Sequence, residues 1–191
     1  MDIFNLAYFW LIIPAVLIFW GIVTYNRFVS FRRIAHEAWS GIAVQLKRRH
    51  DIIPNLVGTV KGYMTHEQAT FENIARLRSA AMQELKTGAS PKDLSLHENA
   101  LSGAIGKLLL NVENYPELRA SQNFISLQGM LQEVEETLQM ARRYHNGTVR
   151  NYIILLESFP SLLIGKIFGF HPEAFFELDN PAEEKNPEVK F

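Results

Sequence analysis

Histidine followed directly by glutamate is the pattern in this sequence that comes nearest to metal chemistry. It occurs three times, at His36-Glu37, His66-Glu67 and His97-Glu98. A zinc-hydrolase helix of the H-E-x-x-H type needs a second histidine one turn after the first, so that both imidazoles bind one ion. The three positions concerned hold Ser40, Thr70 and Leu101. We therefore interpret the pairs as charged groups on helix surfaces and predict no metal site.

Other reactive constellations are also incomplete. The run from Gly103 to Lys107 is too short for a phosphate-binding loop, and no G-x-S-x-G nucleophile elbow occurs. The sequence has no cysteine, so it offers no thiolate set for structural zinc, and this agrees with a reducing compartment. His145 lies on an apolar helix face, where a packed histidine is a simpler interpretation than a ligand. We expect neither an enzyme nor a cofactor.

The segments that would position such groups are helical. From residue 27 to residue 86 there is no Gly-Pro cluster and no strict alternation, and apolar residues recur three, four or seven positions apart. They are Ala35, Trp39, Ile42, Leu46, Ile53, Val57, Val60, Met64, Phe71 and Ile74. Pro54 interrupts this run. We predict a helix kink there, because proline removes the hydrogen bond to the His50 carbonyl.

Two further helices follow a loop at residues 87–91. Ser90 and Pro91 predict the N-cap and first position of a helix that runs to about Asn111. Gly103 and Gly106 lower its helix propensity, which suggests close approach to a neighbouring element. The next helix carries a seam whose residues lie alternately three and four apart, as in bundle packing. This seam comprises Phe124, Leu127, Leu131, Val134, Leu138, Ala141, His145, Thr148, Tyr152 and Leu155.

Residues 161–170 (SLLIGKIFGF) form a short apolar segment after Phe159-Pro160. About ten residues are too few to span a bilayer. The segment therefore either caps the bundle or touches a membrane or a second subunit. Capping is the simpler alternative, because an aromatic cluster is rarely left exposed. The candidate contact residues are Leu162, Leu163, Ile167, Phe168 and Phe170.

Residues 3–26 carry no charged side chain. A helix of this length extends roughly 36 Å, which exceeds the roughly 30 Å hydrocarbon core of a bilayer. A signal peptide would need a basic start and a small-residue cleavage site, and a buried core helix would be shorter and more amphipathic. We therefore predict one uncleaved transmembrane span. Its interfacial anchors are Tyr8, Trp10, Trp20 and Tyr25.

Basic residues follow this span, whereas almost none precede it. This basic collar consists of Arg27, Arg32, Arg33, Lys47, Arg48 and Arg49. By the positive-inside rule the N-terminus lies outside and the following domain in the cytoplasm. The collar also suits anionic headgroups of membrane lipids, although fixing the topology already accounts for it. No basic stripe continues along the domain, so nucleic acid is not an expected partner.

Several stretches of the chain resemble the LemA family. They are EAWSGIAVQLKRR from Glu37, DIIPNLVGTVKGY from Asp51, LSGAIGKLLLNVENYPELRASQNF from Leu101, ARRYHN from Ala141 and FPSLLIGKIFGF from Phe159. The resemblance covers nearly the whole chain. It implies a bacterial inner-membrane protein with one N-out span and a cytoplasmic bundle of long antiparallel helices. Family relatives are linked to magnetosome membranes, and the resemblance implies no reaction and no catalytic residues.

The sequence thus predicts an all-α protein in three parts. These are an N-terminal transmembrane anchor over 1–26, a bundle of three to four long antiparallel helices with a short apolar C-terminal helix over 27–170, and an acidic tail over 171–191. Two functions stay open. A scaffold would form homo-oligomers at the inner membrane and organise the membrane or partner proteins. An adaptor or sensor would regulate a membrane protease, kinase or transporter, with Pro54 and His145 as movable points.

Overall fold

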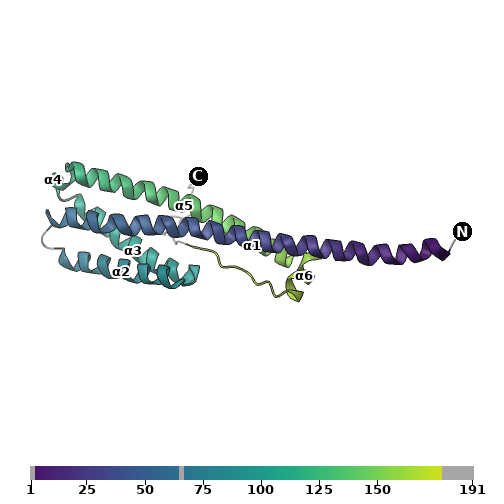
Figure 1. The fold of residues 1–191 in the computed structure, drawn as a ribbon. Helices are drawn as coiled ribbons and strands as arrows, with labels where there is room; N and C mark the ends of the chain where they lie inside the picture. The colour runs from purple at the N-terminus through teal and green to yellow at the C-terminus, as the bar shows by residue number, and fades with distance from the viewer. Residues whose placement is uncertain (1–2, 65–66, 178–191) are drawn as a thin grey trace, which may run out of the picture. The chain divides into compact units, whose positions relative to one another are not determined.

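Helices account for the regular structure of the residues that the computed structural model describes, which are 3–64 and 67–177, with side chains from residue 12 onward. Figure 1 shows their order along the chain. They are α1 (Ile3–Lys61), α2 (Gln68–Thr87), α3 (Pro91–Val112), α4 (Pro116–Arg119), α5 (Gln122–Glu157) and α6 (Ser161–Ile167). No strand occurs in these residues. The predicted all-α class, with long helices and a short apolar C-terminal helix, is confirmed.

Two compact units share α1 and α5 between them. Unit 1 comprises Met1–Ala38 and His145–Glu173, and unit 2 comprises Trp39–Tyr144 and Ala174–Phe191. The predicted boundary at residue 26 falls inside α1, because the helix continues without interruption past the end of the uncharged segment. Most of the predicted acidic tail, from residue 178, lies outside the described residues.

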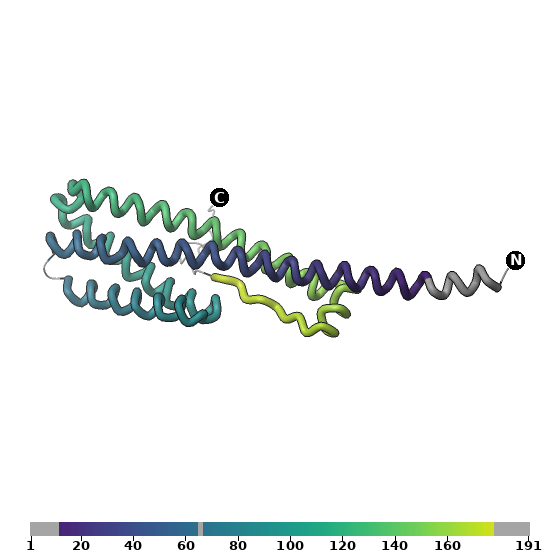
Figure 2. Tube along the Cα trace, viewed as in Figure 1, coloured from purple at the N-terminus to yellow at the C-terminus, as the bar shows by residue number. Residues whose placement is uncertain are grey.

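Unit 2 is an antiparallel helical bundle. The second half of α1, α2, α3 and the first half of α5 lie side by side in it, as Figure 2 shows along the chain trace. Its larger core cluster includes Ile53, Leu56, Val60, Phe71, Ile74, Leu101, Ile105, Leu108, Leu118, Phe124 and Leu131. A second cluster contains Ile42, Leu46, Leu94, Leu138 and Phe176. The burial of these apolar side chains is what stabilises the bundle.

The chain reverses direction after Lys61, and this differs from the expected helical run to residue 86. α1 continues through Pro54 and ends before a turn at Gly62 and Tyr63. The lost hydrogen bond at Pro54 does not end the helix, because its neighbours Ile53 and Leu56 are both buried in the core. Glycine also lowers helix propensity by about 1 kcal/mol, which favours the end of α1 just before Gly62. The kink at Pro54 itself stays a prediction.

The start of α3 and the seam of α5 are confirmed. The Ser90 hydroxyl accepts a hydrogen bond from the Asp93 N–H at 3.2 Å, and Pro91 is the first helical residue. Every residue of the predicted α5 seam is buried or half-buried. The periodicity alone therefore identified the face of α5 that packs.

Unit 1 contains the first part of α1, the second half of α5, and α6. Its core cluster is Phe28, Tyr152 and Leu155, with Phe31, Leu156, Ile164 and Phe170 packed against it. The rings of Phe28 and Phe170 stack with centroids 4.8 Å apart. A Cβ on Gly165 would lie 3.1 Å from Leu156 Cδ2, so a larger residue there would require the Leu156 side chain to shift.

Gly103 and Gly106 do not mark a close approach within the chain, contrary to the expectation from sequence. A Cβ built at either position would meet nothing within 4 Å, and both residues are exposed. They lie on the face of α3 opposite to the buried Leu101, Ile105 and Leu108, so their small size is not used in this fold.

Candidate membrane-interface site

The uncharged part of α1 presents large apolar side chains to its surroundings. Between Ile12 and Val23 these side chains are exposed, with Ile18 at 64% and Phe19 at 69%. Mean hydropathy over the most apolar stretch is 1.6, and this is the single helix of the described residues that is long and apolar enough to cross a membrane. The core helix of a soluble protein would bury such side chains.

α6 packs against the end of this uncharged segment. A Cβ on Gly21 would lie 3.7 Å from Ile164 Cδ1. The ring of Phe168 meets Tyr25 edge-on, with centroids 4.9 Å apart. A small hollow of about 330 Å³ lies beside these contacts. Its lining is apolar apart from the phenol of Tyr25, and comprises Ile18, Gly21, Ile22, Tyr25, Ile164 and Phe168.

The other face of α6 is open. Ile167 is 73% exposed, Leu163 and Phe168 are also exposed, and Phe159 just before α6 is 79% exposed. Leu162 and Phe170 are half-buried. The packed side of α6 agrees with the capping alternative, because Ile164 packs against the core cluster of unit 1. What covers the exposed face stays a prediction.

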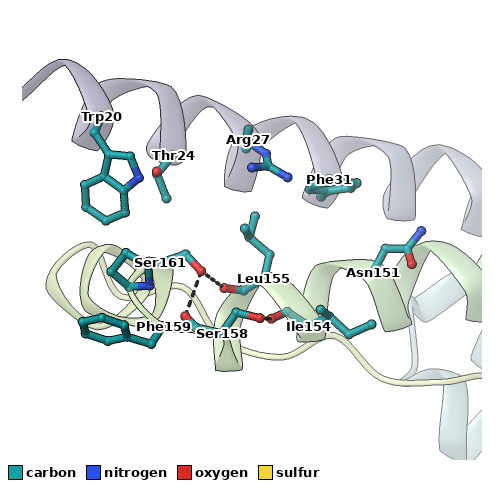
Figure 3. Close-up of a pocket in the computed structure, with 11 residues that line it drawn as sticks. Trp20, Thr24, Arg27, Phe31, Asn151, Ile154, Leu155, Ser158, Phe159 and Ser161 are labelled. Carbon is teal, nitrogen blue, oxygen red and sulfur yellow. Dashed lines mark hydrogen bonds between the residues drawn. The ribbon is translucent and has the colours of Figure 1, made fainter. Parts of the chain in front are cut away.

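A larger hollow of about 410 Å³ opens between α1 and α5 in unit 1 (Figure 3). α1 contributes Trp20, Thr24, Arg27 and Phe31, which face residues of α5 and of the segment that follows it across the hollow. The remaining lining residues are Asn151, Ile154, Leu155, Ser158, Phe159, Pro160 and Ser161. We call this hollow the interface pocket. It combines one cation, several polar groups and an apolar side.

Two serines complete the end of α5 at the floor of the interface pocket. Ser161 Oγ donates to the Leu155 carbonyl at 2.7 Å and Ser158 Oγ donates to the Ile154 carbonyl at 2.6 Å (Figure 3). The Ser161 hydroxyl thus supplies a partner to a carbonyl in the last turn of α5, where backbone partners run out, whereas the Ile154 carbonyl also accepts from the Ser158 N–H at 2.9 Å. The floor is therefore ordered by its own hydrogen bonds.

The basic collar divides into exposed and buried members. Arg27, Arg33, Lys47 and Arg48 are exposed, and Arg32 Nε pairs with Glu173 Oε1 at 3.2 Å. Arg49, in contrast, is buried at 1% exposure, so its placement in a headgroup-facing collar is corrected here. Of the predicted anchors, Trp20 is half-buried and Tyr25 is exposed, whereas the side chains of Tyr8 and Trp10 lie outside the described residues.

Arg49 belongs to a buried charge cluster in unit 2. Its Nη1 donates to Glu98 Oε2 at 2.7 Å and its Nη2 donates to Ser102 Oγ at 2.6 Å. Its Nε lies 2.7 Å from Glu135 Oε1 in an ion pair, but the N–H is not aligned for a hydrogen bond. His50 Nε2 lies 2.7 Å from Glu98 Oε1, and His50 Nδ1 has no hydrogen-bond partner within the part of the chain that the structure describes.

The interpretation of His97-Glu98 as a surface pair is therefore wrong for Glu98. Its side chain is fully buried, and Arg49 and His50 compensate the buried charge by contacting both carboxylate oxygens. His97 is more open and pairs with Glu84 at 2.9 Å. In the described residues no three His, Asp or Glu side chains group in a way that could hold a metal ion. The charge cluster thus connects α1 to α3 and α5 within the bundle.

His145 and Tyr152 are polar residues buried on the α5 seam of unit 1. His145 is packed, as predicted, with Nδ1 3.3 Å from the Ala35 carbonyl oxygen. The Tyr152 hydroxyl has no hydrogen-bond partner among the described residues. Burial raises the pKa of Tyr152 above its usual value, the nearby Arg32 charge lowers it, and Glu173 raises it. The net effect keeps Tyr152 protonated.

Fold and site together define a helical-bundle protein with a candidate membrane helix and a pocket beside that helix. The chain belongs to the LemA family, whose pattern matches residues 38–191. It is 21% identical to the magnetosome protein MamQ of Magnetospirillum gryphiswaldense, over 84% of this chain and 67% of the relative. The magnetosome protein MamQ 2 of Paramagnetospirillum magneticum is 23% identical with the same coverage.

A protein named LemA from Metamycoplasma hominis is 26% identical over 76% of this chain and 60% of the relative. The chain therefore spans about two thirds of the length of these relatives or less. Their names state no reaction. The family resemblance is confirmed, and the findings fit a membrane-associated protein.

Proposed function

We propose that this chain is a membrane-anchored scaffold that assembles with copies of itself at the bacterial inner membrane. α1 spans the bilayer once with its N-terminus outside, and the helical bundle lies on the cytoplasmic side. The exposed apolar residues of α1 and the basic residues that follow them support this topology. The contacts of Gly21 and Tyr25 with α6 support an uncleaved anchor, because these residues belong to the packed structure of unit 1.

One feature of unit 2 carries the self-assembly part of the proposal. α3 bears a second stripe, on the face away from the core, formed by Leu96, Gly103, Gly106 and Leu110. The spacings of seven, three and four are those of a helix-packing seam. Leu96 and Leu110 are 61% and 65% exposed, and the glycines between them leave room for another backbone. We call this the α3 outer stripe and assign it to a second copy.

The test measures particle mass of the full-length protein in mild detergent and in nanodiscs. The natural chain should form oligomers, and Leu110→Glu should shift them to smaller particles by placing a charge inside the seam. Ala75→Glu introduces the same charge at an exposed position of α2 and should leave the mass unchanged. A natural chain that is monomeric in both media contradicts self-assembly. A monomer that retains one stoichiometric protein partner would favour the adaptor instead.

A further inference from the structure

We propose that the interface pocket binds the phosphate of an anionic phospholipid headgroup. This inference rests on the membrane anchoring of the proposed function, but it does not depend on self-assembly. The ligand class follows from three properties of the pocket: its height along α1, the charge of its lining and its division into a polar and an apolar side.

The height of the pocket is set by α1. Trp20, Thr24 and Arg27 follow one another at four and three residues, so they lie on one face of the helix. They rise roughly 10 Å along the axis. Trp20 belongs to the uncharged segment and Arg27 is the first charged residue after it. In the membrane, the pocket would therefore lie at the boundary between the hydrocarbon core and the headgroup layer, which contains the lipid phosphates.

The charge of the lining selects an anion. Arg27 is the one charged side chain of the pocket, and no carboxylate of the described residues pairs with it. The Thr24 hydroxyl, in a residue only 5% exposed, and the Trp20 indole N–H also border the hollow. Guanidinium binds phosphate through paired, charge-assisted hydrogen bonds. Because no carboxylate is present for an amine headgroup, we expect a preference for anionic over zwitterionic lipid.

The polar and apolar sides of the pocket match the two ends of a phospholipid. Asn151 borders the hollow from α5, and its amide can donate to the same phosphate. The serine hydroxyls at the floor already donate to carbonyls of α5. Phe159 and Ile154 are exposed at the pocket and present an apolar surface to the start of an acyl chain. A free phosphate would leave this surface in contact with water.

The experiment counts lipid molecules retained by the full-length protein. Each variant is reconstituted into vesicles of phosphatidylcholine with a minor share of phosphatidylglycerol, extracted gently, and examined by native mass spectrometry. Arg27→Gln should lower retained phosphatidylglycerol on the order of tenfold, as expected when a charge-assisted hydrogen bond is lost. Arg27→Lys should retain part of the lipid, because the charge remains but the paired donors do not.

Arg33→Gln is the matched control. Arg33 is an exposed member of the collar that does not line the pocket, so its loss should change retained phosphatidylglycerol by less than about twofold. If Arg27→Gln and Arg33→Gln lowered the retained phosphatidylglycerol equally, the proposed binding in the interface pocket would be wrong, because the overall positive charge would then retain the lipid. No loss in Arg27→Gln would overturn the proposed binding as well.

Failure of the anchoring itself gives a different result. All variants and the natural chain should remain in the membrane fraction after alkaline extraction. If the natural chain is released, the membrane span is wrong. If it stays embedded but phosphatidylglycerol is not enriched over phosphatidylcholine, only the pocket assignment fails. Thr24→Val, which removes a hydroxyl at nearly constant volume, gives a second variant that should lower retention without unfolding unit 1.

Discussion

Arg49 and Glu98 bring opposite charges into the interior of unit 2, where water does not reach them. Taking ions out of water is costly, and the cost is offset only while every charged atom keeps its partner. Here the carboxylate of Glu98 has Arg49 on one oxygen and His50 on the other. Removal of one member leaves the others buried without compensation. The cluster is therefore more sensitive to single substitutions than the apolar core around it.

We expect Glu98→Gln to lower the free energy of unfolding by about 3 kcal/mol, because the Arg49 charge loses its buried counterion. Thermal unfolding of the full-length protein in detergent, followed by circular dichroism, measures this change. Glu135→Gln is the control. Glu135 is 36% exposed, so its ion pair with Arg49 should contribute less than about 1 kcal/mol. A loss with Glu135→Gln equal to that with Glu98→Gln would contradict this account.

The position of the charge cluster was predictable from register, although residue type concealed it. Arg49 occupies the gap between Leu46 and Ile53 in the buried face of α1, and Glu98 occupies the gap between Leu94 and Leu101 in α3. In each helix the two apolar residues are seven positions apart. The charged residue between them lies three positions from one and four from the other, which places it on the same buried face. Residues of opposite charge at equivalent positions on the buried faces of two helices indicate a buried ion pair. The partners Ser102 and Glu135 depend on the tertiary packing of α3 and α5, and no local pattern identifies them.

Tyr152 gives a prediction about alkaline pH. The pKa of Tyr152 is raised by burial, so the folded state keeps the phenol protonated while the unfolded chain ionises it from about pH 10. Its contribution to stability is therefore complete below pH 10 and is lost as the pH rises above that value. Tyr152→Phe should make the alkaline loss of stability shallower, as measured by urea unfolding across pH. It should not lower the melting temperature at neutral pH, because the hydroxyl has no partner to lose. A steeper alkaline loss in the variant would show that the buried hydroxyl is not the cause.

α6 shows how an element of seven residues can serve two environments. Gly165 and Ile164 face the packed side, where α5 and Phe28 approach closely. Leu163 and Ile167 face outward. An isolated helix this short is not stable in water, so its conformation depends on the packed side. Sequence patterns indicated an apolar segment but could not divide its residues between two faces, because that division is set by the docking of Gly165.

We expect the exposed face of α6 to lie in the headgroup layer of the membrane. The sequence contains no cysteine, so Ile167→Cys provides a single site for an environment-sensitive dye. In vesicles the dye at residue 167 should show blue-shifted emission and be quenched by spin-labelled lipid. Ala75→Cys, on the exposed face of α2, should show neither effect. Identical emission at both sites would place α6 in water or against protein instead.

At the scale of the whole molecule, α1 and α5 each contribute to both compact units. The family and the helical class were predictable from sequence, because heptad spacing and segments that resemble the family extend over long stretches. The division of α1 and α5 between two units was not predictable. The apolar seam of each helix is continuous, so its spacing does not show where the packing partners change. This division is also not visible in composition, because both units are helical and apolar inside.

A chain that starts at Arg27 should keep unit 2 folded and loosen unit 1. It lacks Gly21, Thr24 and Tyr25, so Ile164 and Phe168 lose the contacts that hold α6. Hydrogen exchange should show protection of α2 and α3 as in the full-length protein, and faster exchange in α6. Equal protection of α6 in both chains would mean that α5 and Phe28 alone position it.

The sharing of α1 between the two units has a consequence for biosynthesis. α1 is made first, yet its buried face is completed only by α5, so translation must pass from Lys61 to Glu157. At roughly 5–20 residues per second, these roughly one hundred residues take several seconds or more. During that time the face of α1 that packs against α5 has no partner. A ribosome-bound nascent chain halted before α5 should therefore recruit holding chaperones, and one halted after Glu173 should not.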